Sequence, residues 1–215
     1  MKPVGTWYFD FISPFAYLQL ARMGALRERV TISPCPIMFA AVLDHHGQLG
    51  PAEIPGKREF TYRMVQWLAD SSALELHFPP AHPFNPLSAL RLALAADSSW
   101  DAVSAIFEHI WKHGRAADRA DDLAEVGARL GIGDVQAAIS APDVKQQLRA
   151  NTDAAIAQGV FGVPTIRLGN QLFWGNDATA MVEAAIADPD FFLRGEYARL
   201  TSLPRSAERA RSRQG

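Results

Sequence analysis

The stretch Val4-Gly5-Thr6-Trp7-Tyr8-Phe9-Asp10-Phe11, followed at once by Ile12-Ser13-Pro14, carries the first two structural signals of the chain. The first eight of these residues form a short run rich in β-forming side chains, which predicts a strand over 4–11. Serine is favoured at the cap before a helix, and proline is favoured at the first helical position. The sequence therefore predicts a strand that passes directly into a helix at Ser13.

Outward from Ser13, apolar residues recur at helical spacing as far as about Arg29. A second short apolar run over 30–37 predicts another strand. A β-α-β unit of this kind usually forms a parallel strand pair with a right-handed crossover. The chain is therefore expected to open with two parallel strands joined by the helix that Ser13 begins.

The middle of the chain shows helical patterns and no strand signal. Glycines and prolines over 40–57 predict a loop with at most a short helical start, and a proline-rich loop is expected over 79–86. A helix over 57–71 would carry Phe60, Met64, Trp67 and Leu68 on one face. Four further helices are predicted, over 87–96, 100–112, 120–130 and 142–158.

Strand character returns near the end of the chain. The runs 165–168 and 171–174 flank Gly169-Asn170, a two-residue turn that strongly favours a hairpin. A helix over 177–187 follows, with Asp177 at its cap or in its first turn. The predicted order of elements is β-α-β, a helical insertion, a hairpin and a final helix.

This order is typical of an α/β fold with a thioredoxin-like core and an inserted all-helical domain, the DsbA-like arrangement. The core would be discontinuous, built from residues 1–39 and 159–200, with the insertion at 40–158. The last ten residues, from Ser206, contain no apolar side chain larger than alanine. Residues 201–215 are therefore expected to form a disordered tail.

The composition argues against two kinds of function, nucleic-acid binding and membrane insertion. The 215 residues carry a formal net charge of −2, which gives no electrostatic support for nucleic-acid binding. The first residues lack the apolar run of a signal peptide, and no segment approaches the roughly 18 to 20 apolar residues that cross a bilayer. A cytoplasmic protein without membrane contact is expected.

Cys35 is the single cysteine, so neither a disulfide within the chain nor a Cys-x-x-Cys redox centre can form. We expect it to be a small buried residue of the second strand. His109 and His113 are four residues apart on a predicted helix, but no neighbouring carboxylate completes a known ligand pattern. No metal site is predicted.

Two motifs are specific enough to suggest a family. They are Phe9-Asp10-Phe11-Ile12-Ser13-Pro14-Phe15-Ala16-Tyr17-Leu18 and Gly159-Val160-Phe161-Gly162-Val163-Pro164-Thr165, the second followed by Phe173-Trp174-Gly175-Asn176-Asp177. Together they resemble the 2-hydroxychromene-2-carboxylate isomerases and the related kappa-class glutathione transferases. The segments 51–57 and 78–87 share the resemblance, which covers about residues 5–190. It implies that glutathione is the cofactor and that the protein is a homodimer.

Ser13 is the candidate catalytic residue. Backbone N–H groups and the helix dipole favour a negative charge at a helix N-terminus. Redox relatives place a cysteine thiolate in that field, but here serine occupies the position and Ala16 lies three residues on. The resemblance implies that a glutathione thiolate takes this place and accepts a hydrogen bond from the Ser13 hydroxyl, which lowers the thiol pKa. The alternative is a plain helix cap.

The resemblance places further glutathione contacts at four points. The Val163 backbone would pair with the cysteinyl part of the ligand, next to a cis Pro164; an ordinary trans proline at the start of a strand is the alternative. Asn176 and Asp177 would receive the γ-glutamyl group, or Asp177 would only cap a helix. Lys57 would meet the other carboxylate of glutathione, or remain solvated. Glu53 departs from the neutral asparagine expected near that position in the family.

The aromatic substrate would lie near Asn85, whose alternative is a turn residue. Phe11 and Phe84, with Phe39 and Trp67, would line an apolar pocket or belong to the core. The resemblance implies interconversion of 2-hydroxychromene-2-carboxylate and trans-o-hydroxybenzylidenepyruvate by reversible thiolate addition, bond rotation and elimination. The alternatives are a conjugating kappa-type transferase, a dithiol oxidoreductase, against which the single cysteine argues, and a binding module without activity.

Overall fold

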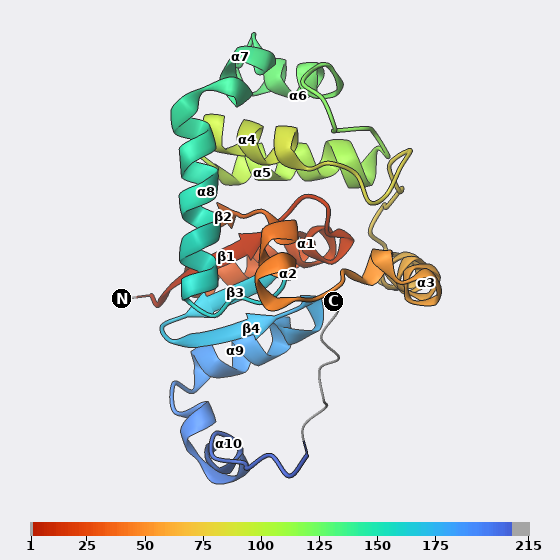
Figure 1. Ribbon diagram of the computed structural model, residues 1–215. Coiled ribbons are helices and arrows are strands. Elements are labelled where there is room, and N and C mark those ends of the chain that lie inside the picture. The colour runs from red at the N-terminus through yellow and green to blue at the C-terminus, as the bar shows by residue number, and fades with distance from the viewer. Residues whose placement is uncertain (1, 208–215) are drawn as a thin grey trace, which may run out of the picture.

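A computed structural model describes residues 2–207, and its centre is one four-stranded sheet. The strands are β1 (Val4–Phe9), β2 (Thr31–Pro36), β3 (Thr165–Leu168) and β4 (Gln171–Trp174), in the order β2-β1-β3-β4. β1 pairs in parallel with β2 and antiparallel with β3. The β-α-β opening and the hairpin are both confirmed, and the thioredoxin-like core is formed by segments from the two ends of the chain (Figure 1).

The first helix forms where the cap signal predicts it. α1 (Pro14–Arg29) begins directly after Ser13, and Pro14 occupies its first position. The helix ends at Val30, which returns to an extended conformation and donates its N–H to the Leu26 carbonyl. Strand β1 ends at Phe9, earlier than predicted, because Asp10 begins the turn that leads into α1.

In the described chain, every regular element between β2 and β3 is a helix or a helical turn, and none is a strand, as predicted for the insertion. Figure 1 shows α4 to α7 gathered on one side of the sheet, with the long α8 leading back to β3. The elements are α2 (Phe39–His46), the 3-10 turn η1 (Pro51–Glu53), α3 (Pro55–Ser71), α4 (Leu87–Ala95), α5 (Trp100–Phe107), the π-helical η2 (Glu108–Lys112), the 3-10 turn η3 (Asp121–Leu123), α6 (Ala124–Arg129), α7 (Val135–Ser140) and α8 (Pro142–Ala157).

Several boundaries differ from the sequence expectation. Helix α2 occupies residues 40–46 of the predicted loop over 40–57, more than the short helical start expected there, and the predicted helix over 100–112 changes to π-helical geometry at Glu108. Helix α7 was missed because its six residues are too few for a clear periodic pattern. The last elements are η4 (Asn176–Ala178), α9 (Thr179–Ala187), η5 (Phe191–Leu193) and α10 (Gly195–Leu200). Residues 201–207 are exposed, and 208–215 of the predicted tail lie outside the described residues.

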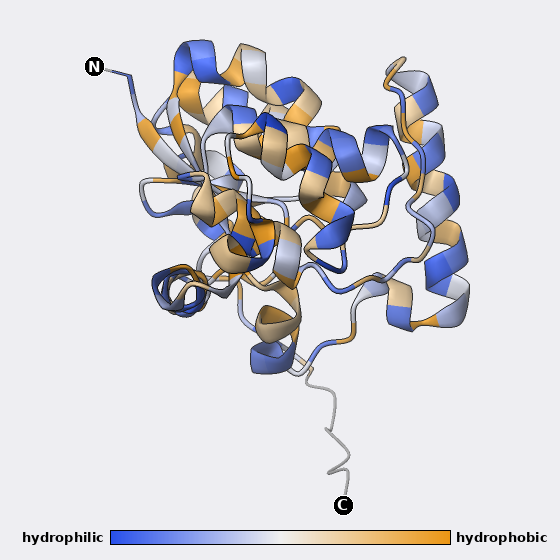
Figure 2. Cartoon of the chain, turned by 90° about the horizontal axis from the view of Figure 1, so that it is seen from above, coloured by the Kyte–Doolittle hydropathy of each residue, from blue (hydrophilic) through white to orange (hydrophobic). Residues whose placement is uncertain are grey.

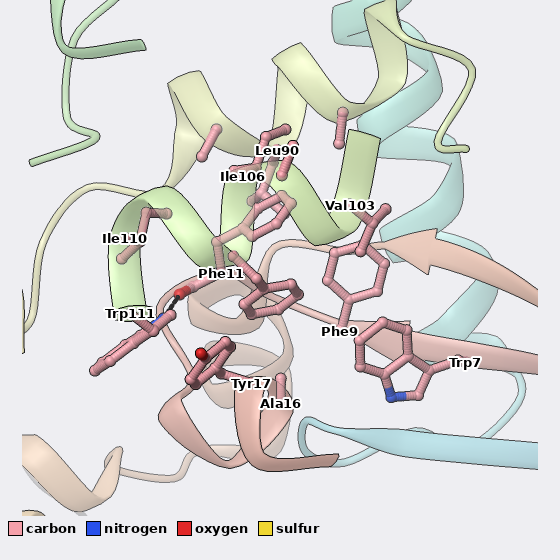
Figure 3. Packing of buried hydrophobic residues seen from close by; sticks show 14 of the residues in the cluster. Trp7, Phe9, Phe11, Ala16, Tyr17, Leu90, Val103, Ile106, Ile110 and Trp111 are labelled. Carbon is pink, nitrogen blue, oxygen red and sulfur yellow. Dashed lines mark hydrogen bonds between the residues drawn. The ribbon is translucent and has the colours of Figure 1, made fainter. Parts of the chain in front are cut away.

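One hydrophobic core joins the sheet to the insertion. Trp7 and Phe9 on β1 belong to the same buried cluster as Phe107 and Trp111 of the insertion. Figure 3 shows the Trp7, Phe9 and Phe11 rings facing the helices of the insertion, and the Trp111 indole donates a hydrogen bond of 2.8 Å to the Phe11 carbonyl. The insertion is therefore continuous with the core of the thioredoxin-like part.

The opposite face of the sheet has a smaller core. Tyr8 lies between Trp7 and Phe9 in β1 and points the other way, into a cluster with Val42 of α2 and Ala155 of α8. Cys35, on β2, packs at the border of this cluster and is partly buried. None of the described helices is both long and apolar enough to cross a membrane.

Candidate functional site

Ser13 caps α1 and leaves its hydroxyl proton available. Its Oγ accepts a hydrogen bond from the Ala16 N–H at 3.3 Å, and the side chain is 7% exposed. Accepting that bond uses one lone pair of the hydroxyl, so the proton can still be donated to another group. The cap role is confirmed, and it is compatible with the predicted catalytic role.

Asp10 lies in the same turn as Ser13, three residues earlier, and was missed by the sequence reasoning. Its carboxylate accepts hydrogen bonds from the Ile12 N–H at 3.1 Å and the Phe39 N–H at 2.9 Å, while its backbone carbonyl accepts one from the Ser13 N–H at 3.1 Å. The residue is fully buried, and this burial raises the pKa of its carboxyl group to about 7. The only signal available was an aspartate among large apolar residues, which by itself names no partner.

The loop before β3 forms the second part of the site. The Val163–Pro164 peptide bond is cis, as predicted. In the sheet, Tyr8 of β1 is paired with Thr165 of β3. The end of β1 lies beside the start of β3. Ser13, which follows β1, and Pro164, which precedes β3, are therefore at the same end of the sheet.

The turn after β4 forms the third part. Gly175 has a φ of 94°, a conformation that strongly favours glycine, and its N–H donates to the Pro164 carbonyl at 2.8 Å. Asn176 and Asp177 begin the 3-10 turn η4 that precedes α9. Within the described chain, the Asn176 Oδ1 is buried without a hydrogen-bond partner, and Asp177 is exposed.

Gln19, another residue that sequence reasoning missed, joins this turn to α1. Its Nε2 donates to the Gly175 carbonyl at 3.0 Å and to the Thr179 Oγ at 3.1 Å. The structure thus brings together Ser13, the Val163–Pro164 loop and the Asn176–Asp177 turn. A glutamine inside a helical pattern gives no sign of partners about 160 residues away.

Lys57 lies apart from these contacts, exposed in the first turn of α3. The neighbouring Arg58 donates to the His82 carbonyl at 2.8 Å, and the His82 ring bonds through Nε2 to the Ile12 carbonyl at 2.8 Å. Burial lowers the pKa of His82, which favours the neutral ring. The start of α3 is therefore tied through His82 to the turn before Ser13, a connection that the sequence did not indicate.

The predicted substrate residues have different surroundings. Asn85 is exposed, and its Oδ1 accepts a bond of 3.1 Å from the Leu87 N–H, as in the turn alternative, while its own N–H donates to Asp118 at 3.0 Å. Phe84 is buried beside His82. Phe11 is 0% exposed and packs against Phe9 and Phe107, as in the core alternative.

Cys35 lacks the reactive thiol of a redox cysteine. Its burial raises the pKa of the thiol to about 12, so little reactive thiolate forms near neutral pH. Among the residues that the structure describes, no three histidine, cysteine, aspartate or glutamate side chains gather as metal ligands would.

The comparisons with known proteins agree with this architecture. The family model of the DSBA-like thioredoxin domain matches residues 6–187. The chain therefore belongs to the DsbA-like thioredoxin family.

Within that family the chain falls with the 2-hydroxychromene-2-carboxylate isomerases and kappa-class glutathione transferases. It is 32% identical over 187 residues to the 2-hydroxychromene-2-carboxylate isomerase of Pseudomonas putida, with 84% of this chain and 92% of the relative covered. Identity to glutathione S-transferase kappa 2 of Caenorhabditis elegans is 25%, covering 87% and 93% of the two chains. A solved 2-hydroxychromene-2-carboxylate isomerase superposes with a TM-score of 0.75 at 27% identity, covering 93% of this chain and 98% of that one.

Proposed function

We propose that the protein is a glutathione-dependent isomerase of 2-hydroxychromene-2-carboxylate or a related intermediate of aromatic, naphthalene-type catabolism. The observation that carries the proposal is Ser13 at the N-terminus of α1, with its hydroxyl proton free and Ala16 in place of a second redox position. A helix N-terminus without a protein sulfur suits a thiolate supplied by a ligand. The similarity to named isomerases supports the same activity.

The residues around Ser13 have the chemistry to hold glutathione. The buried Asn176 Oδ1 has no partner within the described chain and is an acceptor for the γ-glutamyl ammonium, which the Asp177 carboxylate would also attract. We assign the Val163 backbone, next to the cis Pro164, to the cysteinyl part of the ligand. Lys57, exposed at the start of α3, would pair with the remaining carboxylate.

When bound, glutathione would supply a thiolate able to add reversibly to a conjugated carbon, which permits rotation about the former double bond. The protein's part is to lower the thiol pKa. The Ser13 hydroxyl would donate toward the sulfur, and the dipole of α1 adds positive potential at this helix N-terminus. Asn85 offers its side-chain N–H₂ to the substrate, and Phe84 contributes the apolar wall beside it.

A kappa-type glutathione transferase is the second candidate, favoured by the similarity to a kappa-class enzyme. The same thiolate site would serve both reactions. The isomerase regenerates free glutathione, whereas the transferase releases a stable glutathione adduct. Mass spectrometry of the products therefore separates the two functions.

The test of the proposal is Ser13→Ala. Loss of the hydrogen bond to a thiolate should reduce glutathione-dependent isomerisation about 10- to 100-fold. The matched control is Ser99→Ala: Ser99 caps α5 and accepts from the Ala102 N–H at 3.2 Å, as Ser13 does from Ala16. Each substitution should lower the free energy of unfolding by about 1 kcal/mol, but only Ser13→Ala should lower activity.

Two results would contradict the proposal. One is full glutathione-dependent turnover in Ser13→Ala, which would leave the residue as a cap alone. The other is isomerisation by the wild-type protein that proceeds undiminished without added glutathione.

We also propose that the protein is a cytoplasmic homodimer. The cytosol holds the glutathione that keeps thiols reduced, and the proposed chemistry needs that supply. Helix α3 exposes Phe60 and Trp67 on the face that the sequence predicted as apolar, with 61% and 65% of their surfaces accessible. Figure 2 shows this helix at the right-hand edge of the molecule, with hydrophobic residues along its length, which suits a face covered by a second copy.

A further inference from the structure

Three segments far apart in sequence make up the proposed glutathione site. Ser13 begins α1, Pro164 precedes β3, and Asn176 and Asp177 follow β4. One tripeptide can contact all three segments at once only if the distances between the segments stay fixed. The contacts of Gln19 show how the chain holds it.

Gln19 is 1% exposed and uses both ends of its amide. Its Oε1 accepts a hydrogen bond of 2.8 Å from the Trp7 indole N–H. Because an indole N–H can only donate, this bond turns the amide oxygen toward Trp7 and the amide nitrogen toward the turn after β4. The two protons of that nitrogen then go to the Gly175 carbonyl and the Thr179 hydroxyl.

Gly175 and Thr179 carry the connection onward. The Gly175 N–H donates to the Pro164 carbonyl at 2.8 Å, so the residue that Gln19 holds also holds the cis-proline loop. The Thr179 hydroxyl donates to the Asn176 carbonyl at 2.8 Å while it accepts from Gln19. All three segments are thus joined through one buried side chain of the helix that Ser13 begins.

We propose that Gln19 is a positioning residue that sets the distance between Ser13 and the Gly175–Asp177 turn, and thereby makes the site selective for γ-glutamyl thiols over shorter thiols. This inference rests on the proposed function, in which the turn holds the γ-glutamyl group. Gln19 itself is buried and touches the turn, so its effect on the ligand passes through Gly175 and Thr179.

The experiment compares glutathione with cysteinylglycine, which lacks the γ-glutamyl group, by calorimetric titration of the full chain. The wild-type protein should bind glutathione more tightly. Gln19→Met, similar in length but without amide donors, should weaken glutathione binding about tenfold and leave cysteinylglycine binding nearly unchanged. Asp134→Ala is the control, because it removes the cap of α7 at the far end of the insertion and should leave the ratio of the two affinities intact (Figure 1).

A second pair of variants keeps the test decisive if Gln19→Met does not fold. Thr179→Val removes the hydroxyl that links Gln19 to Asn176, and Thr179→Ser retains it. The selectivity for glutathione should fall in Thr179→Val and be preserved in Thr179→Ser. Equal selectivity in the valine and serine variants would overturn the inference.

The remaining outcomes separate the two claims. A wild-type protein that binds neither thiol, or binds both equally, would contradict the proposed glutathione site. A wild-type protein that prefers glutathione, together with a Gln19→Met variant that keeps this preference or weakens both ligands equally, would leave the glutathione site in place and overturn the role of Gln19.

Discussion

Asp10 and Ser13 share one turn, and the chemistry of each depends on it. The Asp10 carboxylate holds the Ile12 and Phe39 N–H groups, and through them it anchors the start of α1 against the segment that enters α2. The turn thus places a buried acid and a helix N-terminus side by side. Protonation of the Asp10 carboxyl group should change the free energy of unfolding by a measurable amount.

We predict that the cost of Asp10→Asn to stability depends on pH. Burial raises the pKa of Asp10 from 3.8 to about 7, so the folded protein binds more protons than the unfolded chain between these values. The wild-type free energy of unfolding therefore falls as pH rises from about 4 to 7, by up to about 4 kcal/mol from this group. Asparagine does not titrate, so urea unfolding should show Asp10→Asn costing more at pH 4.5 than at pH 8.

Asp134→Asn provides the comparison for this measurement. Asp134 also accepts a backbone hydrogen bond, at 2.8 Å from the Ala137 N–H, but it lies on the surface. Its substitution measures, at both pH 4.5 and pH 8, what the loss of one such backbone acceptor costs on the surface. A cost of Asp10→Asn that stays constant over this range would show that the buried carboxyl does not titrate as described.

At the scale of elements, the tip of the insertion depends on a close contact between α6 and α7. Gly127 of α6 lies against Val135, the first residue of α7, and a β-carbon at position 127 would overlap that side chain and lie 3.0 Å from the Ile132 carbonyl. The glycine therefore permits a short interhelical approach that no other residue allows.

Two glycine substitutions test this packing. Gly127→Ala should lower the free energy of unfolding by about 1–3 kcal/mol, since the added methyl group forces α6 and α7 apart. Gly24→Ala, on the exposed side of α1 with no atom within 4 Å of the new carbon, should raise it by about 0.5–1 kcal/mol. Thermal or urea unfolding measures both, and destabilisation of equal size would contradict the packing explanation.

At the scale of the whole molecule, one core and one uncovered helix face stand out. The rings of Trp7, Phe9 and Phe107 join the sheet to the insertion, so the two parts share their hydrophobic stabilisation. Helix α3 instead turns apolar side chains outward, where its own chain does not cover them. We therefore expect two copies of the protein to associate through α3.

The substitution Trp67→Glu should convert a dimer into a monomer, because a charged residue in an apolar interface is left without a partner. Size-exclusion chromatography with light scattering at micromolar concentration measures the change. Leu193→Glu is the control: Leu193 is similarly exposed but lies near the C-terminus, away from α3. A wild-type monomer, or a Trp67→Glu dimer, would contradict the α3 interface.

Local signals made much of the fold predictable. The Ser13-Pro14 cap and the Gly169-Asn170 turn each depend on neighbours within four residues, and both elements begin where these residues place them. The periodic patterns over 57–71 and 142–158 likewise correspond to α3 and α8. Short helices such as α7 were not predicted, since six residues make less than two helical turns and show no clear periodicity.

The sequence by itself determined the α/β order, the place of Ser13 at a helix start and the absence of a second cysteine, because caps, turns and composition act over a few residues or none. Only the tertiary structure decided that Gln19 holds Gly175, that Asp10 holds Phe39 and that Phe11 lies in the core. Those facts depend on which side chains become neighbours after the chain has closed. Hydrogen bonds and burial between distant segments leave no pattern in the linear order of residues.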